Sequence, residues 1–286
     1  MKWTPGYQSN DVEVRDREAR GGRGMGLLGG ILPLVMSKFG IVGVIVVVGG
    51  FFLFQNFVGG GSGVTEQPSA QSTSSANLKA DPRVQFASFV LDDVQKSWAE
   101  QFAAQNKTYQ RAKLVIFQNG TSTGCGYGES ATGPFYCPRD QNVYLDLDFF
   151  RTLSQKLGAN GDFAQAYVIG HEVGHHVQHL LGLIDESGRQ QGANGASVRT
   201  ELQADCFAGI WAHDTSTRDL LENGDLEEAL TAAASIGDDR LQKMERGTVQ
   251  PEKWTHGSSA QRVASFKRGY ETGRMDACDS SKLGNP

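Results

Sequence analysis

The chain has 286 residues, enough for one large or two small domains, and 39% of them are hydrophobic, which excludes a wholly disordered protein. With 27 Lys and Arg against 32 Asp and Glu, the formal net charge is -5. The chain therefore has no general attraction for phosphate backbones, and nucleic acid is not an expected partner. All six histidines lie between His171 and His256, which indicates where the chemistry lies.

Residues 39–58 form an apolar stretch of 20 residues, FGIVGVIVVVGGFFLFQNFV, which as a helix is about 30 Å long and predicts one transmembrane helix. A cleaved secretory signal is the alternative, but 38 residues precede the stretch and no convincing cleavage site follows it. Six Lys and Arg precede the stretch, and none follows it until Lys79. This asymmetry predicts a single-pass protein of the inner (plasma) membrane, with residues 1–38 as a cytoplasmic tail and the rest periplasmic or extracellular.

Residues 59–78 are mainly Gly, Ser, Thr and Gln, a composition typical of a flexible linker, so the folded domain is expected to comprise residues 79–286. Apolar residues at three- and four-residue steps from Phe86 to Phe102 predict an amphipathic helix. The segments 113–118 (KLVIFQ) and 143–147 (VYLDL) are strand-like.

The second half of the chain is predicted to be mostly helical from Asp162 onward. Asp225 with Glu228 three residues later is typical of a helix start. Another helix is expected to begin at Ser259 and to end at Gly273. The expected fold class is α+β, mostly helical with a small sheet.

The most informative motif is H-E-x-x-H, formed by His171, Glu172 and His175 inside an apolar helical run. Residues four apart lie on one helix face, so both imidazoles can bind one Zn²⁺. Glu172 lies beside the metal and can act as the general base for a water molecule that zinc activates.

A catalytic zinc needs a third protein ligand. The positions that a C-terminal His ligand would require hold Gln178 and Leu181, so that pattern is absent. Glu201 is the better candidate, with Asp205 four residues later on the same predicted helix to accept a hydrogen bond from a ligand histidine. One alternative is that Glu201 and Asp205 only form a solvated helix face. Another is that His179 replaces Glu201 as the third ligand.

The set of His171, Glu172, His175, Glu201 and Asp205 resembles the zinc site of the gluzincins, the thermolysin-type peptidases. More closely, the chain is similar to the putative neutral zinc metallopeptidases of bacteria, a family of single-span membrane proteins. The likeness covers nearly the whole chain except the linker and the extreme C-terminus. It rests on the segments KWTPGYQSNDV, GPFYCPRDQNVYLDLDFF, HEVGHHVQ, ELQADCFAGIWAH and THGSSAQR. The resemblance implies a zincin-like domain that binds one zinc ion.

The other histidines have less specific interpretations. His256 lies in a Gly/Ser loop and could stabilise the oxyanion formed during peptide hydrolysis. In gluzincins a His or Tyr has this role. The alternative is that His256 has only a loop or capping role. Tyr127 and Tyr136 are alternatives for the oxyanion role. His176 is interpreted as a surface or packing residue, and His213 as a structural residue at a helix end.

Four cysteines allow three pairings, and disulfides are the expectation outside the cytoplasm. We expect Cys125 to pair with Cys137 across a short Gly- and Pro-rich turn, and Cys206 to pair with Cys278. Zinc binding by these thiols is the alternative, but the sequence has no C-x-x-C pair.

These observations predict a membrane-anchored zinc endopeptidase that hydrolyses peptide bonds, with an extended peptide or protein substrate along a strand of the Lys113–Leu147 region. The principal alternative is a zinc-dependent binding or assembly protein without turnover. A structural zinc would need neither Glu172 nor an open coordination position. If the protein were a membrane scaffold without metal, the H-E-x-x-H motif together with Glu201 and Asp205 would have arisen by coincidence.

Overall fold

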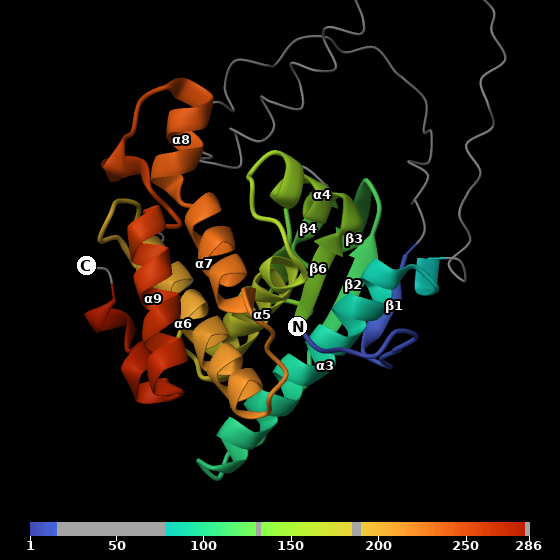
Figure 1. Ribbon diagram of the computed structural model, residues 1–286. Helices are drawn as coiled ribbons and strands as arrows, with labels where there is room; N and C mark the ends of the chain where they lie inside the picture. Colours follow the sequence, from blue (N-terminus) through green and yellow to red (C-terminus); the bar gives the residue numbers. More distant parts are fainter. Residues whose placement is uncertain (16–77, 130–132, 185–189, 284–286) are drawn as a thin grey trace, which may run out of the picture.

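Figure 1 shows the computed structural model of the protein, which describes residues 1–15, 78–129, 133–184 and 190–283. The described part combines a small sheet with a larger group of helices, as the sequence predicts. The α+β expectation is therefore confirmed.

The main sheet has four strands in the order β1 (Val12–Val14), β2 (Lys113–Phe117), β6 (Asn142–Asp146) and β5 (Phe135–Cys137). The first three run parallel, and β5 pairs antiparallel with β6. Four of the five side chains of β2 and of β6 are buried, which explains why these strands are rich in large apolar residues. A separate hairpin joins β3 (Gly120–Thr123) to β4 (Gly126–Glu129).

Helix α5, Asp162–Leu180, lies between the sheet and the helices α6 (Ala196–Thr217) and α7 (Asp225–Ser235) (Figure 1). It also contacts β5, β6 and α3 (Pro82–Ala103). The predicted helical second half is confirmed. The α-helices of the described residues are α3 (Pro82–Ala103), α4 (Leu147–Gln155), α5, α6 (Ala196–Thr217), α7 (Asp225–Ser235), α8 (Asp238–Arg246) and α9 (Ser259–Thr272), with short 3₁₀ helices η2 (Pro251–Lys253), η3 (Met275–Cys278) and η4 (Ser280–Lys282).

Helix α9 begins and ends where the sequence predicts. Ser258 and Gln261 form a reciprocal capping box at its start, and Gly273 closes it in the left-handed conformation with φ 61°. Helix α3 begins after Asp81, whose carboxylate accepts a hydrogen bond from the Arg83 backbone N–H. Local capping therefore fixes the ends of two helices that pack on the core.

Three glycines allow the helices around α6 to approach closely. A Cβ atom on Gly174 of α5 would lie 2.9 Å from the Ala204 carbonyl oxygen of α6. A Cβ atom on Gly269 of α9 would lie only 1.9 Å from the Cys206 carbonyl oxygen, and one on Gly209 would lie 2.1 Å from the Phe266 carbonyl oxygen. Because Gly174 lies inside the H-E-x-x-H motif, the close approach of α5 and α6 brings that motif toward Glu201.

The first 15 residues of the chain pack on the domain. Strand β1 pairs with β2, with Val12 opposite Leu114, and Met1 is only 2% exposed within the main hydrophobic core. The expected separate tail of residues 1–38 does not include this packing, because three residues of strand carry little sequence signal. Leu78, the last residue of the predicted linker, is also buried.

The structure contains both expected disulfides. Cys125 pairs with Cys137 beside the β3–β4 hairpin, and Cys206 of α6 pairs with Cys278 of η3. No cysteine is free. All four thiols are therefore engaged in disulfides rather than in a metal site.

In the described ranges, which leave out residues 16–77, no helix is long and apolar enough to cross a membrane. The predicted span at residues 39–58 lies outside those ranges, as does the linker up to residue 77. The span stays a prediction.

Candidate metal centre

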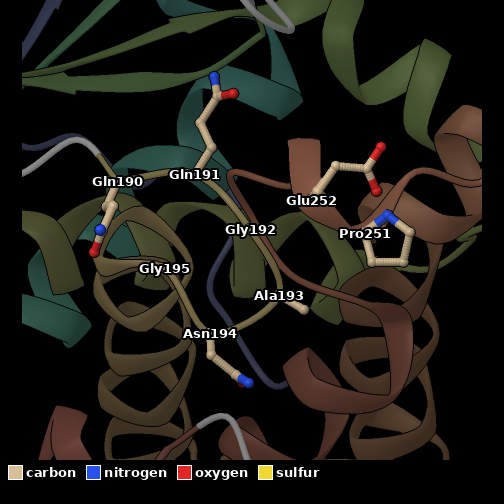
Figure 2. A pocket seen from close by; sticks show the side chains of 8 residues that line it. All are labelled: Gln190, Gln191, Gly192, Ala193, Asn194, Gly195, Pro251 and Glu252. Atoms are coloured by element: carbon tan, nitrogen blue, oxygen red, sulfur yellow. The ribbon is translucent and has the colours of Figure 1, made fainter.

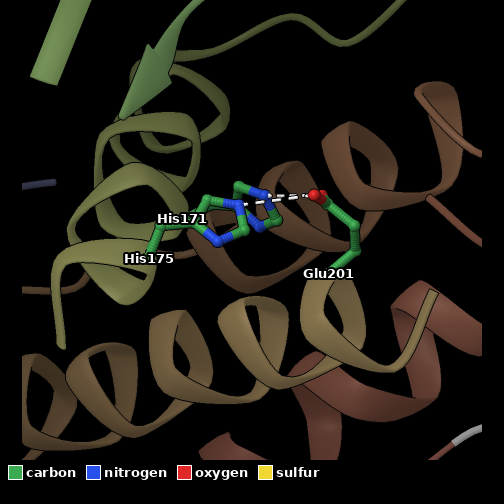
Figure 3. A group of neighbouring side chains, drawn as sticks. All are labelled: His171, His175 and Glu201. Atoms are coloured by element: carbon green, nitrogen blue, oxygen red, sulfur yellow. Dashed lines mark hydrogen bonds and ion pairs between the residues drawn. The ribbon is translucent and has the colours of Figure 1, made fainter. Parts of the chain in front are cut away.

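Two helices bring His171, His175 and Glu201 together. His171 and His175 extend from α5, and Glu201 extends toward them from the first turns of α6 (Figure 3). The His171 Nε2 atom lies 3.2 Å from Glu201 Oε2, and the His175 Nε2 atom lies 3.5 Å from Glu201 Oε1. One atom from each residue lies within 4.8 Å of the other two.

These distances fit a zinc site. In a tetrahedral site with bonds of about 2 Å, neighbouring ligand atoms are about 3.3 Å apart. The two His–Glu distances lie on either side of that value. Two imidazole nitrogens and one carboxylate also form a ligand set typical of catalytic zinc, which keeps a fourth position open.

The other ring nitrogen of each histidine has a hydrogen-bond acceptor. His171 Nδ1 lies 2.8 Å from Asp205 Oδ1, and His175 Nδ1 lies 2.8 Å from the Gln178 side-chain oxygen. Each Nδ1–H therefore donates, which orients both Nε2 atoms toward Glu201. The predicted position of Asp205 behind a ligand histidine agrees with this geometry.

The charges of the site favour a cation. Burial disfavours a charged His171, but Asp205 and Glu201 outweigh that cost and raise the pKa of His171 to about 10. Burial likewise opposes the charge of Glu201, yet the facing His175, His256 and His171 hold the pKa of its carboxyl well below the usual range. The two carboxylates thus stay ionised around a pair of imidazoles.

Arg262 of α9 forms a buried ion pair with the Asp205 carboxylate. Asp205 is fully buried, and its two carboxylate oxygens accept hydrogen bonds of 2.9 Å from Nη2 and Nε of Arg262. The Tyr167 hydroxyl also donates to Asp205. Burial opposes the charge of Asp205, but Arg262 and His171 outweigh it, so the pKa of this carboxyl is lowered. Arg262 could not be identified from the sequence, because a single Arg on a helix carries no spacing signal.

A second chain of contacts supports His175. Gln178 is fully buried, and its amide nitrogen donates to the Thr200 carbonyl oxygen at 2.7 Å and to the Gln203 side-chain oxygen at 3.0 Å. Gln203 in turn donates to the Cys278 carbonyl oxygen at 2.8 Å. This amide chain connects His175 to the Cys206–Cys278 disulfide.

Glu172, the predicted general base, follows His171 on α5 and is 8% exposed. It forms no hydrogen bond or ion pair with any residue that the structure describes. Its carboxylate therefore has no protein partner there that would compete with a water molecule.

His256 interacts electrostatically with the candidate ligand Glu201 and is bound by Asp238. Its Nδ1 atom is 3.3 Å from Asp238 Oδ1 and 2.9 Å from the Thr255 hydroxyl. Asp238 is fully buried and accepts backbone hydrogen bonds from Thr255, His256 and Gly257. Burial lowers the pKa of His256, but the charge of Glu201 and the hydrogen bond to Asp238 raise it overall.

The remaining candidates lie outside the group of metal ligands. His179 Nε2 lies 3.5 Å from the Gln141 amide, and His213 Nδ1 lies 2.6 Å from the Tyr270 carbonyl oxygen, which agrees with a structural role. Tyr127 is 49% exposed on β4.

His176 is fully buried between two polar partners, which agrees with the packing interpretation. Its Nε2 lies 2.6 Å from the Gln110 carbonyl oxygen, and its Nδ1 lies 3.0 Å from the Tyr136 hydroxyl. Nε2 therefore donates to Gln110, and Nδ1 accepts from Tyr136. Because the Tyr136 proton is engaged in this way, His256 is the better oxyanion candidate.

Two other features of the described residues do not contain the candidate ligands. A surface pocket lies between the loop before α6 and the η2 region (Figure 2), lined by residues 190–195, Pro251 and Glu252. A second acidic group consists of Asp162, Asp225 and Glu228. Two of its members form ion pairs with the α-amino group of Met1, which lies 2.7 Å from Asp162 Oδ1 and 3.2 Å from Asp225 Oδ2.

Residues 1–281 match the family described as "Putative neutral zinc metallopeptidase". The chain belongs to this family. The match covers the N-terminal segment, both site helices and the C-terminal 3₁₀ helices. The resemblance that the motifs indicated is therefore confirmed.

Two relatives match this chain over different shares of its length. The chain is 46% identical to the "Uncharacterized protein YpfJ" of Escherichia coli K12, over 98% of both chains. It is 47% identical to the "Uncharacterized protein Rv2575" of Mycobacterium tuberculosis H37Rv, over 60% of this chain and 63% of that one. No solved structure matches the chain.

Proposed function

We propose that this family member is a zinc-dependent endopeptidase. The convergence of His171, His175 and Glu201, at distances that suit one tetrahedral zinc ion, carries the proposal. The three groups come from two helices separated in sequence by a loop, so their meeting is a property of the fold and not of one helix face.

His171, His175 and Glu201 would hold the ion, and a bound zinc ion would polarise the scissile carbonyl and lower the pKa of a water molecule toward about 7. Glu172 would accept the proton of the attacking water and then deliver it to the nitrogen of the leaving amine. The lack of a protein partner for Glu172 among the described residues supports this role.

His256 would stabilise the negative charge that develops on the carbonyl oxygen. Asp238 and Thr255 bind its Nδ1 atom, which leaves Nε2 free for the substrate. The raised pKa of His256 favours a ring that carries a proton on Nε2. Asp238 would act as a positioning residue for His256.

The substrate would lie extended along β5. This strand is an edge of the sheet, so one side of its backbone has no strand partner among the described residues. An extended peptide can add to such an edge through backbone hydrogen bonds. Strand β5 contacts α5, and Tyr136 of β5 donates to His176, which directly follows the ligand His175.

The Glu172→Gln variant tests turnover. It should retain zinc and the wild-type melting temperature while peptide cleavage falls by roughly 10²–10⁴-fold, because the base for the attacking water is lost. Zinc content is measured on the purified full-length chain, and cleavage on proteins that accumulate in membranes carrying the variant. Glu100→Gln, an exposed change on α3, serves as the matched control.

Equal cleavage by wild type and Glu172→Gln would contradict the peptidase proposal. Zinc binding with no cleavage by either chain would favour the zinc-dependent binding protein. Loss of zinc in Glu172→Gln would instead show that Glu172 is a ligand.

We further propose that residues 78–286, here called the metal domain, work outside the cytoplasm and are attached to the plasma membrane through residues 39–58. The two disulfides support an oxidising compartment. The apolar stretch supports membrane attachment.

A further inference from the structure

Residues 1–15 are bound to the metal domain along their whole length. At their C-terminal end, β1 forms a parallel ladder with β2, in which Val12 lies opposite Leu114 and Val14 opposite Ile116. Arg15 continues the contact, because its backbone N–H donates to the Ile116 carbonyl oxygen at 2.8 Å. This pairing covers an edge of the sheet that would otherwise present unpaired backbone groups.

A polar network holds the middle of the segment. Asp92 of α3 accepts hydrogen bonds from the Tyr7 hydroxyl at 2.9 Å and from the Ser9 hydroxyl at 3.0 Å. Arg111 forms ion pairs with both Asp92 and Asp11. The segment is thus fixed by side chains of α3 and of the chain just before β2.

The first residues are anchored by burial. Met1 is part of the main core, and the Trp3 ring meets Phe86 of α3 edge to face at 5.5 Å. The Lys2 backbone N–H donates to the Leu220 carbonyl oxygen at 2.8 Å, and its side-chain amine lies 2.8 Å from Asp219. Leu220 and Asp219 lie in the loop between α6 and α7, so the first residues contact a part of the chain that is distant in sequence.

We infer that residues 1–15 and the metal domain lie on the same side of the membrane that residues 39–58 enter. A strand cannot pair with a sheet, nor a methionine fill its core, across a bilayer. One crossing between residues 15 and 78 would place the two parts on opposite sides. The chain between them must therefore return to the side that it leaves, which differs from the expected cytoplasmic N-terminus with an external domain.

The sequence contains a second apolar stretch that suits a returning chain. Residues 25–36 (MGLLGGILPLVM) are 12 apolar or small residues, separated from the 39–58 stretch by Ser37 and Lys38. Twelve residues are fewer than a helix needs to cross the hydrocarbon core, a length typical of re-entrant segments. The two stretches together therefore suit a hairpin that enters the bilayer and returns to the side from which it came. The placement of residues 1–15 does not depend on whether the metal site catalyses peptide hydrolysis.

Two single cysteine variants test the side of each part. Gln8→Cys places a thiol on an exposed residue of the N-terminal segment, and Met244→Cys places one on α8, where Met244 is 57% exposed. The native cysteines form disulfides and leave the new thiol as the one to be labelled. A membrane-impermeant maleimide is applied to spheroplasts carrying the full-length chain, before and after permeabilisation.

We expect both thiols to be labelled in intact spheroplasts, at levels that permeabilisation changes by less than twofold. Labelling of Gln8→Cys only after permeabilisation, with Met244→Cys labelled before it, would overturn the inference. Release of the full-length chain from membranes by alkaline carbonate would overturn the membrane part of the proposal.

A zero-length cross-link tests the docking itself in membranes. A carbodiimide should join the Lys2 amine to the Asp219 carboxylate, because these groups are in contact at the surface. Peptide mass mapping should find the 2–219 link in wild type and lose it in Lys2→Arg, whose guanidinium keeps the charge but does not form the amide. Absence of the link in a wild-type chain with both disulfides intact would overturn the inference.

Discussion

Asp205 combines two tasks at one buried carboxylate. One oxygen accepts the Nδ1 proton of His171, and the same group is neutralised by Arg262, which is 2% exposed. A buried carboxylate without such a partner would be protonated or would destabilise the fold. Arg262 thus keeps Asp205 ionised, and Asp205 in turn keeps the His171 ring oriented.

Replacing Arg262 by Leu should therefore affect both stability and metal binding. It leaves the charge of Asp205 buried without its cation, which costs about 3–5 kcal/mol of unfolding free energy. Zinc affinity should also fall, because His171 loses its fixed orientation. Chemical denaturation and zinc titration measure the two effects.

Arg268→Leu, an exposed change on the same helix, serves as the control for Arg262→Leu and should leave both quantities unchanged. Wild-type stability together with wild-type zinc affinity in Arg262→Leu would show that Asp205 does not depend on this partner.

Zinc content of single Ala variants should distinguish the proposed ligands from their neighbours. Glu201→Ala should lose most bound zinc, because only two of the three ligand atoms would remain. His179→Ala should keep it, because His179 lies outside the ligand group and contacts Gln141 instead. Metal analysis of dialysed protein gives the answer, and full zinc in Glu201→Ala would move the third ligand elsewhere.

At the scale of elements, the Cys206–Cys278 disulfide closes a loop and also fixes one end of the amide chain that leads to His175. It joins α6 to η3 across a sequence separation of 72, and the Cys278 carbonyl oxygen ends the amide chain through Gln203 and Gln178 to His175. A loop of this length corresponds to about 4 kcal/mol in the chain-entropy model of disulfide stabilisation.

The double variant Cys206→Ala/Cys278→Ala should accordingly unfold at lower denaturant and bind zinc more weakly, because Gln203 loses a fixed acceptor. The matched control is Cys125→Ala/Cys137→Ala. Its loop has a sequence separation of only 12 and corresponds to about 3 kcal/mol. This second pair should lower stability and leave zinc affinity unchanged. Equal zinc affinity in both double variants would show that the amide chain does not influence His175.

Sequence could predict the elements whose signals are local. The capping residues of α9, the four-residue spacing on α3 and the H-E-x-x-H spacing on α5 all lie within one element. Strand β1 could not be predicted, because three residues carry little periodicity and their partner Leu114 is distant in the chain. The Asp205–Arg262 contact could not be predicted from the sequence either, because it depends on how α6 and α9 pack.

At the scale of the whole molecule, the folded unit consists of two separate pieces of chain, residues 1–15 and the metal domain. Residues 1–15 supply an edge strand, a core methionine and the cation that faces Asp162 and Asp225. Burial disfavours the Met1 ammonium, but both carboxylates outweigh that cost and raise the pKa of its amino group. A fragment that begins at residue 78 lacks all of these groups.

The fragment 78–286 should therefore be less stable than the full chain and prone to self-association through the exposed edge of β2. Joining residues 1–15 to residue 78 by a Gly/Ser linker should restore the stability. Melting temperature and sedimentation compare the two chains, and a permuted 1–15 sequence on the same linker is the control. Equal stability with native and permuted segments would show that the docking contributes nothing.

The distance in sequence between docked partners also sets an order of events during synthesis. Met1 binds Asp225, which lies 224 residues later. At a ribosome rate of about 5–20 residues per second, these partners are made roughly 10–45 s apart. During that interval the apolar stretches leave the ribosome while the N-terminus still has no place to bind. An insertion machinery that left the first residues on the cytoplasmic side would therefore deprive the finished external domain of its edge strand permanently.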